Sequence, residues 1–208
     1  MDELVRAPVP EGVYICCFCQ TDNLLSQWRS YGANGTGVSI QVNPAGFAHV
    51  TGADSPCGGL MRLWKIFYDP AQQKRILKKA LDFGFAHSPA LPIGERARQA
   101  ADAIHFFIPT FKNQDFGEES ELRLIFTPPP NCSVRPQFRV ARGMLVPYYS
   151  LRELSGGFPT PNDPLPITGV RIGPSAQKLL NVASAQMLLN DFGYPGVRVE
   201  YSATPYRG

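Results

Sequence analysis

The sequence contains no long hydrophobic run and carries little net charge. Hydrophobic residues make up 44% of the 208 residues. However, no apolar run approaches the roughly 18 residues of a membrane-spanning helix. The formal net charge of +3 is too small to indicate a nucleic-acid surface by itself. Residues 1–11 are acidic and contain proline, and they lack the apolar core of a signal peptide. We therefore expect a cytoplasmic protein with no membrane contact.

The sequence also lacks the usual signatures of catalysis and metal binding. Its three histidines have no nucleophile or metal partner at a useful spacing. There is no Ser/His/Asp pattern, phosphate-binding loop or dinucleotide fingerprint. The odd count of five cysteines, including Cys16, Cys17 and Cys19, indicates free thiols in a reducing compartment. Because C-C-x-C is poor spacing for zinc and no C-x-x-C partner exists, no metal site is expected.

The sequence does contain strand-like and helix-like segments in mixed order. Strands are expected near residues 12–19, 37–42, 60–68, 121–126, 134–139, 144–148, 167–172 and 196–201. About four helices are expected between them, near residues 22–32, 70–84, 94–111 and 175–192. Because strands and helices do not alternate regularly, the pattern indicates an α+β fold with mixed or antiparallel sheets. We expect one domain over residues 1–208, with tails at 1–11 and 202–208 and a Pro/Gly-rich loop at 150–166.

Residues 113–126, NQDFGEESELRLIF, are the strongest candidate for chemistry. They pass from a polar loop into an apolar strand, and the alternation of side chains predicts Glu119, Glu121 and Arg123 on one face. A fixed carboxylate such as Glu121 could stabilise an oxocarbenium-like transition state in cleavage of an N-glycosidic bond. Glu119, on the loop side, could orient or deprotonate an attacking acceptor. The alternative is a solvated sheet face on which Glu121 and Arg123 neutralise each other.

Two further segments could contact a ligand. Ser26, Trp28 and Tyr31 lie on one predicted helix and could present a hydroxyl and two flat rings to a planar ligand, although such spacing is also typical of a core. Arg207, near the C-terminus, could pair with a phosphate or carboxylate, or it could lie free in solvent.

The order of these segments resembles the bacterial family catalogued as domain of unknown function 2971. The resemblance covers about Val13 to Arg207. The residues that carry it are Cys17-Phe18-Cys19, Asp22, Trp28, Tyr31, Gly37-Val38-Ser39-Ile40, Lys112, Phe116, Glu119, Glu121, Arg123, Ile172-Gly173-Pro174, Ser202 and Pro205-Tyr206-Arg207.

More distantly, E-S-E-L at a loop–strand junction is similar to the E-x-E motif of ADP-ribosyltransferases, which use NAD. That similarity implies a split sheet, with Glu121 contacting the nicotinamide ribose and Glu119 assisting the acceptor. It also implies that the strand and helix bearing Ser26, Trp28 and Tyr31 hold the nicotinamide. The first-strand Arg or His of that superfamily has no clear counterpart here, so Arg123 and Arg207 are the candidates to replace it.

The leading hypothesis is therefore an NAD-dependent ADP-ribosyltransferase-like enzyme, a toxin or phage-defence effector. NAD is the expected substrate, and the acceptor, a protein or nucleic acid, is not specified by the sequence. A partner protein or antitoxin is a further expectation. The alternative is a non-catalytic nucleotide- or protein-binding module of a bacterial defence or stress system. A third hypothesis is a nucleic-acid-processing enzyme that holds a divalent metal with Glu118, Glu119 and Glu121.

Overall fold

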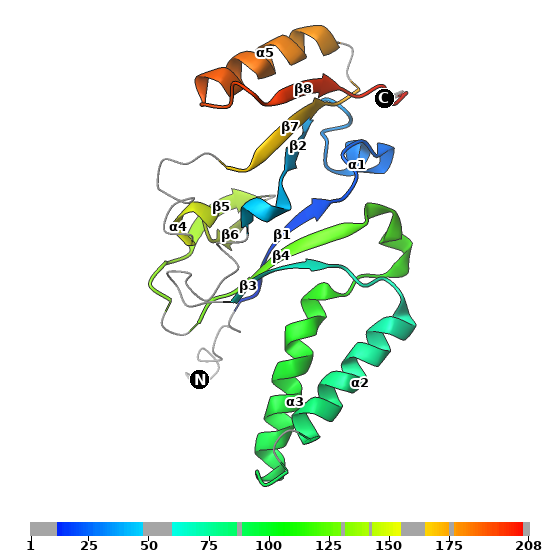
Figure 1. The fold of residues 1–208 in the computed structure, drawn as a ribbon, viewed down its shortest axis with the longest axis vertical. Coiled ribbons are helices and arrows are strands. Elements are labelled where there is room, and N and C mark those ends of the chain that lie inside the picture. Colours follow the sequence, from blue (N-terminus) through cyan, green and yellow to red (C-terminus); the bar gives the residue numbers. More distant parts are fainter. Residues whose placement is uncertain are drawn as a thin grey trace. The chain divides into compact units, whose positions relative to one another are not determined.

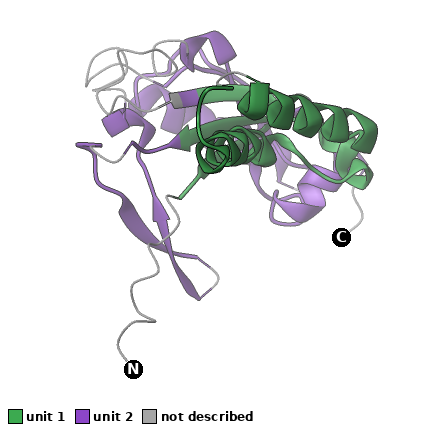
Figure 2. Cartoon of the chain, turned by 90° about the horizontal axis from the view of Figure 1, so that it is seen from below, with its two compact units in different colours: residues 1–20, 62–126 green, residues 21–61, 127–208 purple. Residues whose placement is uncertain are grey.

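The structure of the protein is a computed structural model that describes residues 12–47, 60–86, 89–129, 132–141, 143–154, 165–174 and 177–205. The chain forms two compact units, each built from two separate parts of the sequence (Figure 2). Unit 1 comprises residues 1–20 and 62–126, and unit 2 comprises residues 21–61 and 127–208. The expected single domain stays a prediction.

Unit 1 is built on a three-stranded sheet in the order β1-β4-β3 (Figure 1). Strand β1 (Tyr14–Cys19) pairs antiparallel with β4 (Glu121–Thr127), and β3 (Leu60–Lys65) lies on the other side of β4. The central position of β4 explains why Leu124, Ile125 and Phe126 are all buried. The apolar end of residues 113–126 is thus a core strand, as its sequence predicts.

Two long helices complete unit 1. Helix α2 (Pro70–Ala86) begins as predicted, because the Asp69 carboxylate accepts hydrogen bonds from the backbone N–H groups of Ala71 and Gln72. Helix α3 (Ile93–Phe107) runs beside α2 (Figure 1). At their crossing, a Cβ atom on Gly84 would lie 2.4 Å from the Cα atom of Ala100. Only glycine permits this approach, which sets the spacing of the two helices.

Unit 2 contains a mixed sheet in the order β2-β7-β8. Its strands are β2 (Val38–Val42), β7 (Ile167–Ile172) and β8 (Arg198–Tyr201), with β2 antiparallel and β8 parallel to β7. Helix α5 (Lys178–Asp191) connects β7 to β8. The buried residues Val170, Ile172 and Val197 form a core against which Val182 and Leu189 of α5 pack.

The remaining elements of unit 2 are short. They are helix α1 (Leu25–Ser30), the 3-10 helix η1 (Pro44–Phe47), the hairpin of β5 (Gln137–Ala141) and β6 (Met144–Tyr148), and helix α4 (Leu151–Leu154). Unit 1 adds the 3-10 helices η2 (Ile108–Thr110) and η3 (Gln114–Glu119).

The secondary structure confirms the predicted α+β class. Several element boundaries differ by a few residues from the sequence prediction, and two expected loop or tail segments contain buried residues. The expected loop 150–166 begins with α4, whose Leu154 is only 1% exposed, and residues 155–164 lie outside the described residues. Ser202, predicted as the start of a tail, is fully buried. None of the helices in the described residues combines the length and the apolar character needed to cross a membrane.

Candidate functional site

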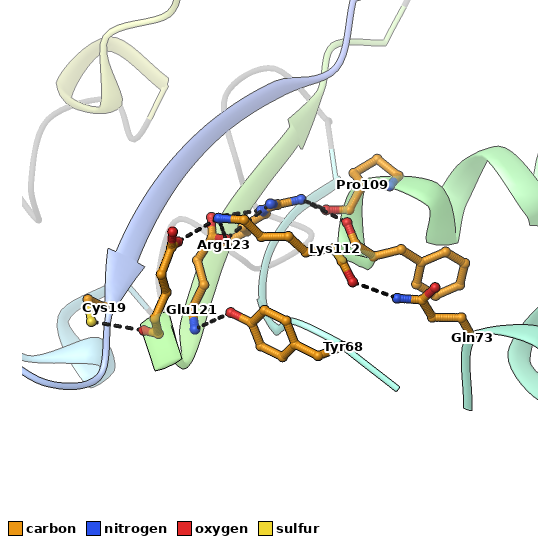
Figure 3. A network of polar contacts seen from close by, with 9 residues as sticks. Cys19, Tyr68, Gln73, Pro109, Lys112, Glu121 and Arg123 are labelled. Carbon is orange, nitrogen blue, oxygen red and sulfur yellow. Dashed lines mark hydrogen bonds and ion pairs between the residues drawn. The ribbon is translucent and has the colours of Figure 1, made fainter. Parts of the chain in front are cut away.

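Four charged side chains of unit 1, Lys112, Glu119, Glu121 and Arg123, are linked by ion pairs into a network that we call the ion cluster (Figure 3). Arg123 binds Glu121 in two places, with Nε 2.8 Å from Oε1 and Nη2 3.0 Å from Oε2. The Lys112 ammonium lies 2.5 Å from Glu119 Oε2 and 3.1 Å from Glu121 Oε2. The predicted grouping of Glu119, Glu121 and Arg123 is therefore present, with Lys112 joining the two carboxylates.

The ion cluster is shielded from solvent. Glu121 is 4% exposed, although it is a charged residue at the end of a strand. The side chains of Arg123, Lys112 and Glu119 are 14%, 19% and 16% exposed. The alternative predicted a solvated sheet face, and this is wrong because the ion cluster is shielded from solvent. Its second part is confirmed, since Glu121 and Arg123 do neutralise each other. A charge buried in this way requires its partners, because an unpaired buried ion is strongly unfavourable.

The backbone around residue 120 brings the two glutamates together. Glu119 ends the 3-10 helix η3 and Glu121 begins β4, so Glu119 lies on the loop side of the junction and Glu121 on the strand, as predicted. Between them Ser120 adopts a left-handed conformation with φ 42° and ψ 51°. This conformation is uncommon for a residue with a Cβ atom and tends to occur at functional sites. With Ser120 in this conformation, the carboxylates of Glu119 and Glu121 both reach Lys112.

Three further hydrogen bonds, each involving a backbone group, hold Arg123, Lys112 and Glu121 in place. Arg123 Nη1 donates to the carbonyl oxygen of Pro109 at 2.6 Å. The Lys112 carbonyl oxygen accepts a hydrogen bond of 2.8 Å from Gln73 Nε2 of helix α2. The Glu121 N–H donates to the Tyr68 hydroxyl at 2.9 Å (Figure 3). The ion cluster is thus fixed by the strands and helices of unit 1 and requires little reorganisation to keep its geometry.

The partners of Glu121 keep its carboxylate ionised. Burial by itself would raise the pKa of Glu121, but the hydrogen bonds from Arg123, Cys17 and Lys112 outweigh it and lower the pKa from 4.5 to about 2. Desolvation likewise lowers the pKa of Lys112, and its hydrogen bonds to Glu119 and Glu121 reverse this and raise it. A carboxylate with so low a pKa is a poor proton acceptor, so Glu121 is suited to binding or to charge stabilisation.

Cys17 lies opposite Arg123 in the β1–β4 register and contacts the same carboxylate. Desolvation first, and then the hydrogen bond to Glu121, raise the pKa of the Cys17 thiol to about 12. Because the thiolate is the nucleophilic form, Cys17 is not suited to covalent catalysis near neutral pH. Its neighbour on the same face, Cys19, donates to the Glu119 carbonyl oxygen at 2.8 Å. Both thiols therefore form hydrogen bonds to the glutamates of the ion cluster, Cys17 to Glu121 and Cys19 to Glu119.

Acid is expected to loosen the β4 strand. The folded pKa of Glu121 lies below its ordinary value of 4.5, so the stabilisation is present above pH 4.5 and is lost as the pH falls towards 2. The shift corresponds to roughly 3 kcal/mol. Hydrogen exchange of the β4 amides, corrected for the intrinsic pH dependence, should show protection that is level from pH 7 to 5 and falls by pH 3. Unchanged protection at pH 3 would contradict the ionised state of Glu121.

The aromatic residues predicted to hold a nicotinamide lie in unit 2. Trp28 is 3% exposed, and its indole N–H donates to Asn23 Oδ1 at 2.9 Å. Tyr31 is 69% exposed. The Ser26 hydroxyl is buried and has no hydrogen-bond partner among the residues that the structure describes. Trp28 therefore has the core position that was the alternative for this segment, and of the three residues only Tyr31 is exposed to solvent.

Asn23 joins the two ends of unit 2. Its Oδ1 atom also accepts hydrogen bonds from Ser202 Oγ at 2.5 Å and Thr204 Oγ1 at 3.1 Å. Because the indole of Trp28 can only donate, the atom it contacts must be the amide oxygen of Asn23. Ser202 of the S-x-x-P-Y-R segment is thus a structural partner of Trp28. Arg207 lies outside the described residues, and its predicted role stays a prediction.

Comparison with protein families supports part of the resemblance seen in the sequence. Residues 27–124 match the family Protein of unknown function (DUF2971). The matched stretch contains Trp28, Tyr31 and the whole ion cluster, whereas the C-F-C strand, the I-G-P segment and the C-terminal segment lie outside it. No curated protein and no solved structure matches the chain. The similarity to ADP-ribosyltransferases therefore gains no support from these comparisons.

Lys112 is one of the residues that carry the resemblance seen in the sequence, but the sequence assigned it no role. Lys112 occupies the position between Glu119 and Glu121 where a cation bound by both would lie. The third hypothesis placed a divalent metal beside these carboxylates. In the described part of the chain, no group of three His, Cys, Asp or Glu side chains is arranged to bind a metal ion. The lysine itself supplies the positive charge that two adjacent carboxylates require.

A second polar network of unit 2 shows what Asp22, another residue of the sequence resemblance, binds. Asp22 accepts hydrogen bonds from Arg171 Nε at 2.8 Å and from Gln41 Nε2 at 2.5 Å. Arg171 also binds Glu200 at 3.0 Å. These residues join the acidic position before α1 to strands β2, β7 and β8. Sequence spacing could not identify this network, since Asp22 and Arg171 are far apart in the chain.

Proposed function

We propose that the protein is an NAD-dependent ADP-ribosyltransferase-like enzyme that cleaves the nicotinamide N-glycosidic bond. The observation that carries the proposal is the carboxylate of Glu121, held ionised with a pKa of about 2 at a loop–strand junction beside a second carboxylate. Cleavage of an N-glycosidic bond develops positive charge on the ribose. A negative group fixed before the reaction stabilises that charge without reorganising.

Glu119 is the residue of the ion cluster that has a carboxylate oxygen available to accept a hydrogen bond from a substrate. Its Oε2 atom is bonded to Lys112, whereas Oε1 forms no hydrogen bond or ion pair with the residues that the structure describes. In this proposal, Oε1 orients the acceptor, and Glu121 provides negative charge through a network that Arg123 holds in place. Arg123 donates to Glu121 and to backbone carbonyl oxygens, so it acts as a positioning residue.

A second function is favoured by a different observation. Both oxygens of Glu121 are bonded to Arg123, and Oε2 is also bonded to Lys112, while only 4% of the residue is exposed. A substrate that needs Glu121 directly must displace one of these partners. The alternative is therefore a non-catalytic module that binds a nucleotide or a protein, in which the ion cluster only stabilises unit 1.

Labelled NAD distinguishes the two proposals. Purified full-length protein is incubated with NAD labelled in the adenylate and with bacterial lysate, and labelled products are quantified. Glu119→Gln should reduce labelling by roughly 100-fold or more, as expected for loss of a group that acts on the attacking acceptor. Glu118→Gln is the matched control, because Glu118 is exposed and next in sequence. Labelling that is equal in wild type and Glu119→Gln would reject the enzyme, and NAD-dependent thermal stabilisation without turnover would favour the binding module.

A further inference from the structure

Helix α5 of unit 2 is apolar on two opposite sides. Its inner side packs on the core of the unit through Val182, Ala185 and Leu189 (Figure 1). Its outer side carries four large apolar side chains that are between 59% and 80% exposed, namely Leu179, Leu180, Met187 and Leu188. Between its first residue and its last, α5 has no charged residue at all. Because a surface helix normally presents charged residues to solvent, the outer side has the composition of a buried surface.

The outer side shows the same order of side-chain sizes in both directions along the helix. Leu180 and Met187 are seven residues apart, which is about two turns, so they lie in one line along the helix. Ala183 and Ser184 lie midway between them and are exposed. One further leucine follows at each end. The order of large, small and large side chains is therefore unchanged when the helix is turned end for end.

This order fits a second copy of the same helix in the antiparallel direction. About a two-fold axis near residues 183 and 184, Leu180 of each copy lies opposite Met187 of the other. The small side chains meet at the crossing, where they allow the two helix axes to come close. A two-fold interface needs this symmetry because both copies use the same surface, whereas an unrelated partner protein would not require it.

The charges at the two ends of α5 favour the same arrangement. Lys178 is the first residue and Asp191 the last, and the helix dipole disfavours each charge at that end. In an antiparallel pair, the Lys178 end of each helix lies beside the Asp191 end of the other, so charges and dipole ends of opposite sign are neighbours. A membrane surface fits less well, since a helix that lies on lipid carries Lys or Arg along its polar face.

We propose that the protein forms a two-fold symmetric dimer in which the outer sides of two α5 helices pack antiparallel. Removal of Leu180 and Met187 from water stabilises the dimer. One helix from each chain gives a contact smaller than the roughly 800 Å² per partner of a standard interface, so we expect association at micromolar or higher concentrations. The dimer uses no residue of the ion cluster and does not depend on the function proposed above.

Sedimentation velocity of the full chain over about 1 to 500 μM, the range in which a small interface associates, measures the dimer. The wild type should change from monomer to dimer across this range. Met187→Glu should weaken association roughly 100-fold or more, because the contact then buries an unpaired carboxylate from each copy. Val140→Glu places the same charge on an exposed apolar residue of β5 and should leave association unchanged.

An exchange of charges tests the antiparallel direction. Leu180→Lys should weaken association as much as Met187→Glu does. An equimolar mixture of the two variants should form a mixed dimer about as readily as the wild type, because the new lysine lies opposite the new glutamate. In a parallel pair the two new charges would not meet, and the mixture would stay monomeric.

Three results would overturn the proposal. The first is a wild type that stays monomeric at the highest concentration. The second is a dimer that Val140→Glu weakens and Met187→Glu does not, which would place the contact at the hairpin. The third is a mixture of Leu180→Lys and Met187→Glu chains that fails to associate, with circular dichroism showing that both variants are folded.

Discussion

Replacing Glu121 with alanine is expected to lower the free energy of unfolding of unit 1 by about 3–5 kcal/mol. The carboxylate is 4% exposed and neutralises Arg123 and Lys112, whose side chains are 14% and 19% exposed. Removing Glu121 leaves two partly buried cations with only Glu119 to compensate them. Such a loss usually exceeds the value of the ion pair itself, because the remaining charges cannot regain their hydration.

Urea denaturation, together with hydrogen exchange of the β4 amides, measures this effect. Glu118→Ala is the matched control, and it should change the free energy by less than about 0.5 kcal/mol, as is usual for exposed side chains. A change below about 1 kcal/mol for Glu121→Ala would mean that the ion cluster contributes little to the fold. Because the stability effect is expected to be large, loss of activity in a Glu121 variant cannot by itself assign catalysis. Glu119→Gln is the better functional probe.

The second large effect is expected at Asn23. Its Oδ1 atom accepts from Trp28, Ser202 and Thr204, and the first two of these residues are 3% and 0% exposed. Asn23→Ala removes the acceptor of all three donors at once. An unsatisfied buried donor costs about 1–3 kcal/mol, so we expect a total loss of about 2–4 kcal/mol for unit 2.

Graded substitutions separate the three hydrogen bonds around Asn23. Thr204→Val removes only the contact of 3.1 Å and should cost about 1 kcal/mol or less. Asn23→Asp keeps an acceptor oxygen and should lose less stability than Asn23→Ala. Hydrogen exchange of the Ser202 amide is a local readout, because the Ser202 N–H donates to the Ile172 carbonyl oxygen at 2.8 Å. If Asn23→Ala cost no more than Thr204→Val, Asn23 would not be the residue that joins these segments.

Local patterns in the sequence predicted much of the fold. Asp69 followed by Pro70 marked the start of α2, and the alternation in residues 121–126 predicted that Glu121 and Arg123 share a face. These features depend on neighbouring residues only, so a single sequence contains them. The left-handed Ser120 was not predictable, because serine rarely adopts that conformation. It places Glu119 outside the strand, in η3.

The partners of the candidate residues were harder to predict. Lys112 is nine residues from Glu121, and its contact depends on the path of the chain through η3. Asn23 meets Ser202 across 179 residues, a separation at which spacing has no predictive value. Trp28 and Ser202 both belong to the resemblance to the DUF2971 family, and that common signal could have suggested that they share a binding partner, which is Asn23. Nothing in the sequence singled out Asn23.

Release of nicotinamide is the most direct test of the proposed function, because nicotinamide leaves whichever acceptor is used. The wild-type chain, Glu119→Gln and Glu118→Gln are compared at equal folded fraction, with NAD and lysate present, and free nicotinamide is quantified by chromatography. The proposal predicts release above the buffer rate by wild type and Glu118→Gln, and a decrease of roughly 100-fold or more for Glu119→Gln. Release at the buffer rate by the wild type, or equal release by wild type and Glu119→Gln, would contradict it.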